Sequence, residues 1–220
     1  LSNAQFVTNT ARWKGGAVSV SLPLSRIECT LCDFTSNTVK TDLNPETQTS
    51  ASIAAPLWRG GGAVSVTRGA SCELSLSRFA SNTASASSGG ALLVSLQSSC
   101  ELSLSTFVDN SANRGGSIAV GTDGSIDVDR TTFKQSTSME YGGAIYAERH
   151  DTVSVRESTI EECVSNKDGG GLYVDGGGKT ILESTELTRL EASGGNGGVI
   201  FLLGESGEVN SGKAFDQWEF

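Results

Sequence analysis

A Gly-Gly doublet that is followed by a small residue and an apolar strand recurs seven times along this 220-residue chain. The doublets begin at Gly15, Gly61, Gly89, Gly115, Gly142, Gly169 and Gly197. After the first interval, every step is 26 to 28 residues. A fixed period of this length is typical of stacked supersecondary units, none of which buries its apolar face alone. The period therefore predicts a solenoid before any single residue is interpreted.

Apolar residues alternate with polar ones after each doublet, which is the period of a strand. Two columns of equivalent positions are apolar throughout: Val18, Val64, Leu92, Ile118, Ile145, Leu172 and Ile200, and then Val20, Val66, Val94, Val120, Ala147, Val174 and Leu202. A second strand has inward columns at Ile27, Cys72, Cys100, Ile126 and Val153, and at Cys29, Leu74, Leu102, Val128 and Val155. Two or three short strands per repeat predict an all-β parallel β-helix of about seven coils with roughly 27 residues per coil.

A Phe-x-x-Asn motif precedes most of the doublets. Its copies are Phe6 with Asn9, Phe34 with Asn37, Phe79 with Asn82, and Phe107 with Asn110. An inward Asn at a corner can donate and accept along the solenoid axis, and Gly-Gly permits positive φ at another corner. We interpret these residues mainly as scaffold, and we keep the motif residues as binding candidates.

One insertion interrupts the period between Asn37 and Gly60. Residues 38–58 are rich in Asp, Asn, Pro and Thr, which predicts an exposed surface loop. Within it, Asp42, Asn44 and Trp58 are binding candidates. We expect residues 1–220 to form a single β-helix domain, and to be a fragment of a longer surface protein.

The net charge at pH 7 is −9. Residues 1–110 carry seven Lys/Arg and seven Asp/Glu, whereas residues 111–220 carry nine and eighteen, so the excess lies in the second half. A nucleic acid or an anionic membrane would require a basic face. We therefore expect no nucleic-acid partner. No apolar run is long enough to cross a bilayer as a helix, so we expect no membrane insertion by this chain either.

The alternation of Phe-x-x-Asn with Gly-Gly-Ala-[Ile/Leu/Val] resembles the repeat of chlamydial polymorphic membrane proteins and related bacterial and protist surface proteins. The matches pair Phe6–Asn9 with Gly15–Val18, Phe34–Asn37 with Gly61–Val64, Phe79–Asn82 with Gly89–Leu92, and Phe107–Asn110 with Gly115–Ile118. From Phe133 onward the chain departs from the motif, because Ser136 and Cys163 replace the Asn.

The resemblance implies a right-handed parallel β-helix that is exported as the passenger of an autotransporter and acts in host-cell adhesion. It thus implies a location at the cell surface and outer membrane, or in secreted form. The expected partner is a host-cell surface protein or glycan, with self-association as a further option, and no cofactor is expected.

Cys72 and Cys100 lie 28 residues apart at equivalent inward positions. In-register neighbouring strands would bring their Cα atoms within reach of a disulfide, although a stacked pair of free thiols fits equally well. Alternation predicts that Cys29 points inward and Cys32 toward the surface. With one His in the chain, this Cys-x-x-Cys is not expected to bind zinc.

A column of acids stands on the outward phase of the second strand: Glu28, Glu73, Glu101 and Asp127. Stacked like charges repel, so Glu73, Glu101 and Asp127 are a weak Ca²⁺ candidate. The alternative is that the solvated side chains simply splay apart.

Aromatic residues form a second outward column at Tyr146, Tyr173 and Phe201. Such a stripe could stack on sugar rings or dock a protein. The alternatives are self-stacking, or cover by the C-terminal segment. Trp13-Lys14-Gly15 and Trp58-Arg59-Gly60 add a basic-aromatic pair near the other end of the chain.

Several parallel β-helices are carbohydrate-active enzymes, which need clustered carboxylates or an acidic Ca²⁺ site with a basic proton acceptor. The chain has no Asp-Asp pair, and Glu161-Glu162 lies near a corner, where adjacent side chains point apart. We interpret the lone His150 as a solvated loop residue. The sequence favours a non-enzymatic adhesin, and the alternatives are such an enzyme or a purely structural surface rod.

Overall fold

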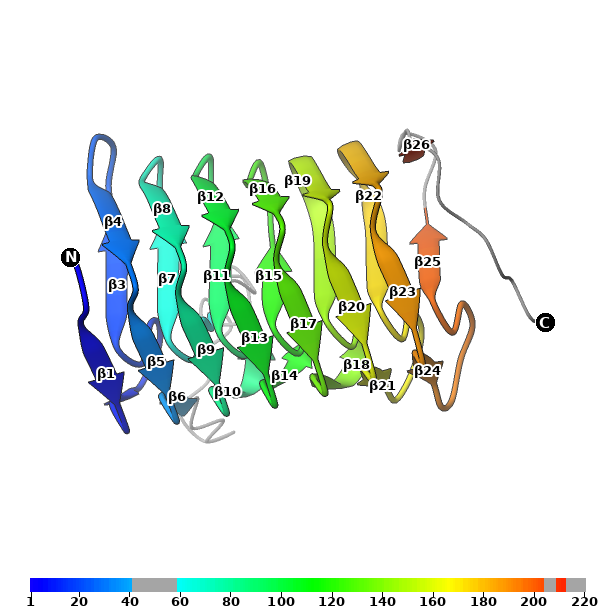
Figure 1. The fold of residues 1–220 in the computed structure, drawn as a ribbon, viewed down its shortest axis with the longest axis horizontal. Helices are drawn as coiled ribbons and strands as arrows, with labels where there is room; N and C mark the ends of the chain where they lie inside the picture. The colour runs from blue at the N-terminus through cyan, green and yellow to red at the C-terminus, as the bar shows by residue number, and fades with distance from the viewer. Residues whose placement is uncertain (41–58, 204–208, 213–220) are drawn as a thin grey trace, which may run out of the picture.

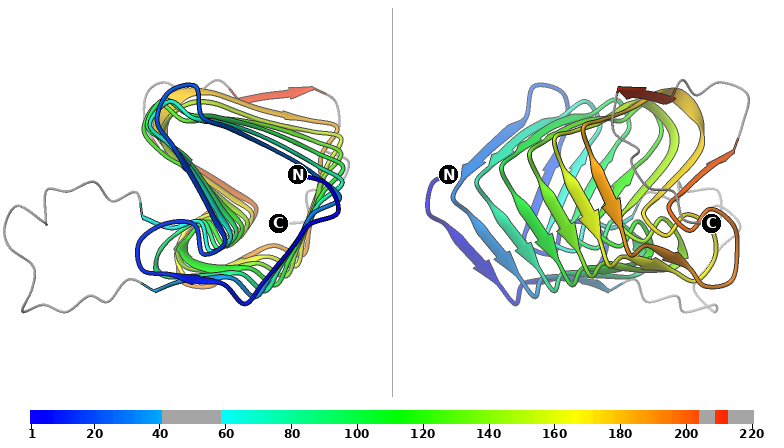
Figure 2. Two further views of the ribbon diagram at one scale, coloured as in Figure 1. Left: turned by 90° about the vertical axis from the view of Figure 1, so that its left-hand side faces the viewer. Right: turned by 45° about the vertical axis from the view of Figure 1, so that its right-hand side comes forward.

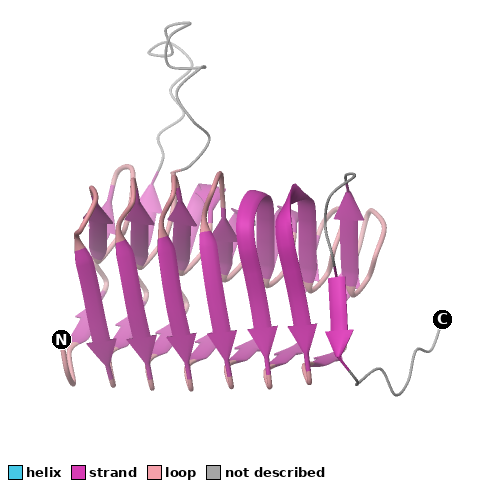
Figure 3. Ribbon diagram, turned by 90° about the horizontal axis from the view of Figure 1, so that it is seen from above, coloured by secondary structure: helices cyan, strands magenta, loops and turns pink. Residues whose placement is uncertain are grey.

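The computed structural model describes residues 1–40, 59–203 and 209–212. Within these ranges every regular element is a β-strand. Figure 1 shows the strands stacked coil upon coil from the N-terminus to the C-terminus, and the view from above shows the same single row (Figure 3). The predicted all-β solenoid is confirmed. In the described residues, no helix is present that could cross a membrane.

The strands form three sheets, and all pairings between the described strands are parallel. The first sheet holds β1 (Gln5–Val7), β5 (Asp33–Thr35), β9 (Arg78–Ala80), β13 (Thr106–Val108), β17 (Thr132–Lys134), β20 (Thr159–Glu161) and β23 (Glu186–Thr188). The second holds β2 (Thr10–Ala11), β6 (Thr38–Lys40), β10 (Thr83–Ser88), β14 (Ser111–Arg114), β18 (Thr137–Tyr141), β21 (Val164–Ser165) and β24 (Glu191–Ala192).

The third sheet bends at a corner, so that it covers two sides of the solenoid. Before the corner stand β3 (Val18–Ser21), β7 (Val64–Thr67), β11 (Leu92–Ser95), β15 (Ile118–Val120) and β25 (Ile200–Leu203). After it stand β4 (Arg26–Thr30), β8 (Ser71–Ser75), β12 (Ser99–Ser103), β16 (Ser125–Asp129) and β26 (Val209–Gly212). Both sides are joined in β19 (Ile145–Arg156) and β22 (Leu172–Glu183). Most coils thus have four strand segments, more than the two or three expected.

The repeats stack in register, so the sequence period is the coil period. Phe34 pairs with Phe6 on one side and with Phe79 on the other. Seen from the N-terminal end, the chain runs clockwise as it recedes, so the helix is right-handed, as the resemblance implies (Figure 2). The same view shows that the cross-section is indented between the second and third sheets rather than convex.

Left-handed backbone residues make the corners. One set lies three residues before each Phe-type position, with φ of 44 to 57°: Asn3, Leu31, Leu76, Leu104, Arg130, Glu157 and Ser184. A second set lies just before each Asn-type position, with φ of 50 to 56°: Thr8, Ser36, Ser81, Asp109, Gln135, Glu162 and Arg189. Such a conformation is unfavourable for L-residues by about 1–2 kcal/mol each, so the stacked coils must hold it in place.

The Gly-Gly doublet makes the corner between the second and third sheets. Its first residue is left-handed, as at Gly89 with φ of 69°. At its second residue, Gly90, a Cβ atom would meet the carbonyl oxygen of Gly116 and the backbone of Ser111 on the next coil. Only glycine permits that close approach, which explains why the doublet recurs at every coil.

The core fills the interior with the columns that alternation predicts. Phe34, Phe79, Phe107 and Phe133 are fully buried and stack with ring centroids 4.5 to 5.0 Å apart. The inward columns from Val64 to Leu172 are buried as expected. Leu202 is 49% exposed, so its predicted inward position does not bury it on the last described coil of that side.

Candidate functional site

The motif residues lie inside the scaffold, with the exception of the first copy. Phe34, Phe79, Phe107, Asn37, Asn82 and Asn110 are all 0% exposed. Phe6 is half-buried and Asn9 is exposed, because no coil of the described chain stacks on their N-terminal side. A partner at the protein surface therefore cannot contact the buried copies, and their role is structural.

The buried Asn residues form a hydrogen-bonded ladder along one corner. Asn82 Nδ2 donates to the Phe34 carbonyl oxygen at 2.8 Å and to Asn110 Oδ1 at 3.1 Å. Its Oδ1 accepts from the backbone N–H of Asn37 at 2.9 Å and from Asn37 Nδ2 at 3.0 Å. Each Asn thus satisfies polar groups at the left-handed turn that the strands leave unpaired.

A second ladder, which sequence reasoning missed, lies two residues before each Phe-type position. Its members are small buried hydroxyl residues: Ser77, Ser105, Thr131, Ser158 and Thr185. Ser105 Oγ, for example, accepts from the backbone N–H of Ser77 at 3.1 Å and donates to the Ser103 carbonyl oxygen at 2.8 Å. The signal was present in the sequence, because a Ser or Thr recurs at this position in five successive repeats.

Cys32 occupies this ladder position in the second coil, and the prediction that it faces the surface is wrong. It is 2% exposed, and its backbone N–H donates to Ser77 Oγ at 3.1 Å. The left-handed Leu31, with φ of 57°, turns the chain between Cys29 and Cys32 and so reverses the alternation. Cys29 is buried as predicted, and burial, followed by its hydrogen bond with Cys32, raises the pKa of the Cys29 thiol to about 12.

Cys72 and Cys100 form a disulfide between adjacent coils, with their Cα atoms 4.5 Å apart. Of the two alternatives left open by the sequence, the disulfide is the one that the structure contains. Cys29, Cys32 and Cys163 are free and buried.

The acidic column is in register and exposed, as alternation predicts: Glu28 pairs with Glu73, Glu73 with Glu101, and Glu101 with Asp127. Arginines flank it at both ends. Arg26 bonds Glu28 at 2.8 Å and Glu73 at 2.6 Å, and Arg156 contacts Asp127. Within the described ranges, no group of three His, Cys, Asp or Glu side chains is arranged to hold a metal ion. Guanidinium groups thus offset the negative charge at both ends of the column, whereas Glu101 in its middle forms no ion pair with the described residues.

The aromatic column is in register, but its interpretation as an exposed stripe is wrong. Tyr146 is 2% exposed and Tyr173 is 5% exposed. Because the cross-section is indented, Tyr141 on β18 lies over them, with its ring centroid 4.6 Å from that of Tyr173. Leu93 and Ala119 also belong to this second hydrophobic cluster, which lies outside the interior core of the solenoid. Only Phe201 is half-buried, so self-stacking is the alternative that the structure shows.

Burial also governs the chemistry of these tyrosines. Tyr146 donates its hydroxyl proton to Glu148 Oε2 at 2.7 Å, and burial together with that bond raises its pKa. Burial, with a contribution from Asp175, raises the pKa of Tyr173 to about 12. Both phenols therefore stay protonated at neutral pH and act as packing groups.

His150 is buried, which overturns its interpretation as a solvated loop residue. It is 3% exposed and lies within the continuous strand β19. Its Nε2 is 3.1 Å from Thr180 Oγ1, and Nδ1 has no hydrogen-bond partner among the residues that the structure describes. Burial lowers the pKa of His150, which keeps the imidazole neutral.

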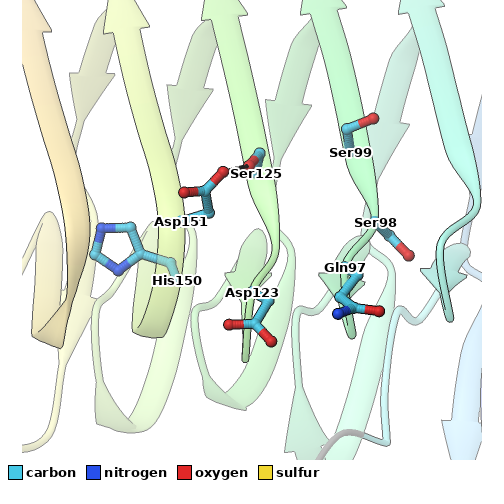
Figure 4. Close-up of a pocket in the computed structure, with 7 residues that line it drawn as sticks. All are labelled: Gln97, Ser98, Ser99, Asp123, Ser125, His150 and Asp151. Atoms are coloured by element: carbon cyan, nitrogen blue, oxygen red, sulfur yellow. Dashed lines mark hydrogen bonds between the residues drawn. The ribbon is translucent and has the colours of Figure 1, made fainter.

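A shallow polar pocket of about 400 Å³ lies beside His150, lined also by Gln97, Ser98, Ser99, Asp123, Ser125 and Asp151 (Figure 4). Ser125 donates to Asp151 Oδ2 at 3.0 Å, whereas the imidazole bonds Thr180 on the next coil. In the described part of the chain, no hydrogen bond joins the serine to the histidine. The three side chains therefore do not form the nucleophile–base–acid chain of a hydrolase.

The insertion begins and ends at one corner of the solenoid. Asp42, Asn44 and Trp58 lie outside the described residues. The chain leaves at Lys40, at the end of β6, and is described again from Arg59, one residue before Gly60 bridges Lys14 and Ser88. The Arg59 guanidinium lies 4.1 Å from the ring centroid of Trp13, so two parts of the predicted basic-aromatic pair meet.

Comparison with models of protein families, with curated proteins and with solved structures finds no match to this chain.

Proposed function

We propose that this chain is a non-enzymatic adhesin segment, located at the cell surface and outer membrane or secreted, which presents an insertion for binding to a host-cell protein or glycan. One observation carries the proposal: the repeat continues in register across the insertion. Thr38 in β6 pairs with Thr10 on one side and with Thr83 on the other. Val64 in β7 likewise pairs with Val18 and with Leu92.

The solenoid therefore carries the extra residues without losing a rung of any sheet. Rigid scaffolds commonly present binding residues on inserted loops in this way, because the stacked strands supply stability and the loop is free to vary. The resemblance to adhesin passenger repeats supports the same role.

The disulfide supports the proposed location. Cys72 and Cys100 are joined across adjacent coils, and such bonds persist mainly in oxidising, extracellular compartments. The structural-rod alternative assigns no binding role to the insertion. Replacing the insertion can therefore distinguish the two roles by experiment.

The test is a binding assay on host cells with the labelled chain, compared with a variant in which residues 41–58 are replaced by a short Gly-Ser linker. The proposal expects saturable binding of the intact chain and its loss in the variant. An Asp42→Ala/Asn44→Ala variant tests whether these two polar candidates account for the loss of host-cell binding. Saturable binding that survives the replacement would remove the insertion from the proposal, and no binding by the intact chain would favour the rod.

A further inference from the structure

Four cationic side chains lie at or next to the corner where the insertion departs: Arg12, Lys14, Lys40 and Arg59. A fifth, Arg68, follows β7 at the other end of that strand, and the Lys14 side chain reaches toward it. Arg12 and Lys40 directly follow Ala11 and Val39, which are paired in register on neighbouring coils. Lys14 forms a backbone bridge with Gly60, the residue after Arg59. The five residues thus come from four separate stretches of sequence and lie on two adjacent coils.

Two of these cations lie against the Trp13 ring. The guanidinium carbon of Arg59 lies 4.1 Å from the ring centroid of Trp13, and that of Arg12 lies 5.0 Å from it. Trp13 is 44% exposed, which is unusual for a large aromatic side chain outside a contact surface. Cation–π attraction holds both guanidinium groups at one exposed ring despite their mutual repulsion, so they are positioned before any ligand arrives.

Lys14 and Arg68 approach each other without a counter-charge. Lys14 Nζ donates to Thr67 Oγ1 at 3.5 Å, which places the ammonium beside the residue that precedes Arg68. Burial lowers the pKa of Lys14, and the positive charge of Arg68 lowers it further. No carboxylate of the described residues pairs with either cation to offset this repulsion.

The cluster differs from the other cations of the chain in having no acidic partner. Nine Lys or Arg residues elsewhere form ion pairs: Arg26, Arg78, Arg114, Arg130, Lys134, Arg149, Arg156, Lys167 and Arg189. Among the described residues, no carboxylate pairs with any of the five clustered cations, and Lys179 is the one other cation in that position. In a chain with net charge −9, these five cations form a local site of opposite sign.

We propose that this cationic corner binds a linear anionic glycan that carries sulfate groups. The inference rests on the proposed adhesive function and names its ligand class. Guanidinium groups recognise such oxyanions with paired, charge-assisted hydrogen bonds. The cations are spread over two coils and do not surround a single small pocket. This spacing suits a polymer, because its repeated anionic groups can contact several cations at once. The disulfide favours an extracellular polyanion over a nucleic acid.

The test measures binding of the intact chain to a sulfated glycosaminoglycan hexasaccharide by calorimetry, with the desulfated hexasaccharide as ligand control. The test variant is Arg59→Gln/Arg68→Gln, and the matched control is Arg130→Gln/Lys179→Gln, which removes the same charge from other coils. All four side chains are outside the core, so circular dichroism should show the fold unchanged. We expect the test variant to bind at least about tenfold more weakly. The control should change affinity by less than about twofold, and added salt should weaken binding to the intact chain.

Four results would overturn the inference: no binding to the sulfated probe, equal binding to the desulfated probe, equal losses in both double variants, or equal affinity for duplex DNA. Host-cell binding that persists without hexasaccharide binding would reject this inference alone. Hexasaccharide binding by a chain that does not bind host cells would instead reject the proposed function and leave the glycan site standing.

Discussion

Replacing Asn82 by Ala should destabilise the protein far more than the same change at Asn9, although both residues occupy the same motif position. The Asn82 side chain makes four hydrogen bonds at distances of 2.8 to 3.1 Å and is fully buried. Its removal deprives the buried backbone N–H of Asn37 of the Asn82 Oδ1 acceptor, and the Phe34 carbonyl, Asn37 Nδ2 and Asn110 Oδ1 each lose one hydrogen bond.

The magnitude follows from these contacts. An orphaned buried donor costs about 1–3 kcal/mol, and each of the three weakened groups adds roughly 0.5–1 kcal/mol, so the free energy of unfolding should fall by about 2.5–6 kcal/mol. Asn9 is exposed, and its side chain makes one bond, from Nδ2 to Asn37 Oδ1 at 2.8 Å. Its replacement should cost at most about 1 kcal/mol.

The assay is urea unfolding followed by circular dichroism, with both variants compared to the parent chain. An Asn82→Asp variant retains the size but loses both donors, so it should also be strongly destabilised at neutral pH. Equal losses for Asn82→Ala and Asn9→Ala, or a loss below about 1 kcal/mol at Asn82, would refute the ladder as a source of stability.

Three further predictions concern the corners, the buried histidine and the disulfide. Gly90→Ala should lower the free energy of unfolding by about 3 kcal/mol or more, because the new Cβ would meet the backbone of the next coil. Gly176→Ala should lower it by about 1 kcal/mol, because Gly176 has φ of 57° but open space around it. Comparable unfolding midpoints for the two variants would contradict this prediction. Burial lowers the pKa of His150 in the folded state, so the unfolded chain binds the proton first and stability should fall as pH drops below the ordinary value of 6.5. His150→Gln should flatten that part of the pH–stability profile. A variant profile identical to that of the parent chain would contradict the assignment of this pH dependence to His150. Reductant should lower the free energy of unfolding by roughly 3–4 kcal/mol through opening a 28-residue loop, and Cys72→Ala/Cys100→Ala should make unfolding insensitive to reductant.

The sequence determined the period, the parallel stacking and most of the core because these follow from local alternation. Val64, Leu92 and Ile118 recur at one phase of equivalent strands, and a strand has only two faces. The register followed from the same columns, since a slip of one residue would expose every member. The Asn ladder was inferred at the level of its role, as an inward corner residue that bonds along the axis.

What could not be predicted depends on the path of the chain around the corners. Cys32 was misplaced because the left-handed Leu31 reverses the alternation, and a leucine gives no signal of positive φ. Tyr146 and Tyr173 were misplaced because alternation shows which side of a strand faces outward, but not that another wall folds back over that side. His150 was taken for a turn residue, yet β19 continues through this point with a left-handed Arg149.

The cationic corner could not be recognised as a site from sequence for a related reason. Trp13-Lys14 and Arg59 were visible as a basic-aromatic pair, but Arg68 and Lys40 join them only when the coils stack. The net charge of −9 indicates no basic site, because the acidic excess of the second half outweighs the local cluster of five cations.

Hydrogen–deuterium exchange of the intact chain, with and without the sulfated hexasaccharide, tests the central claim that binding belongs to the corner where the insertion departs. The account predicts added protection of backbone amides within residues 12–14, 38–40 and 59–69, and unchanged exchange elsewhere on the described coils. Protection confined to the pocket beside Asp123 and Asp151, or to the acidic column, would contradict it.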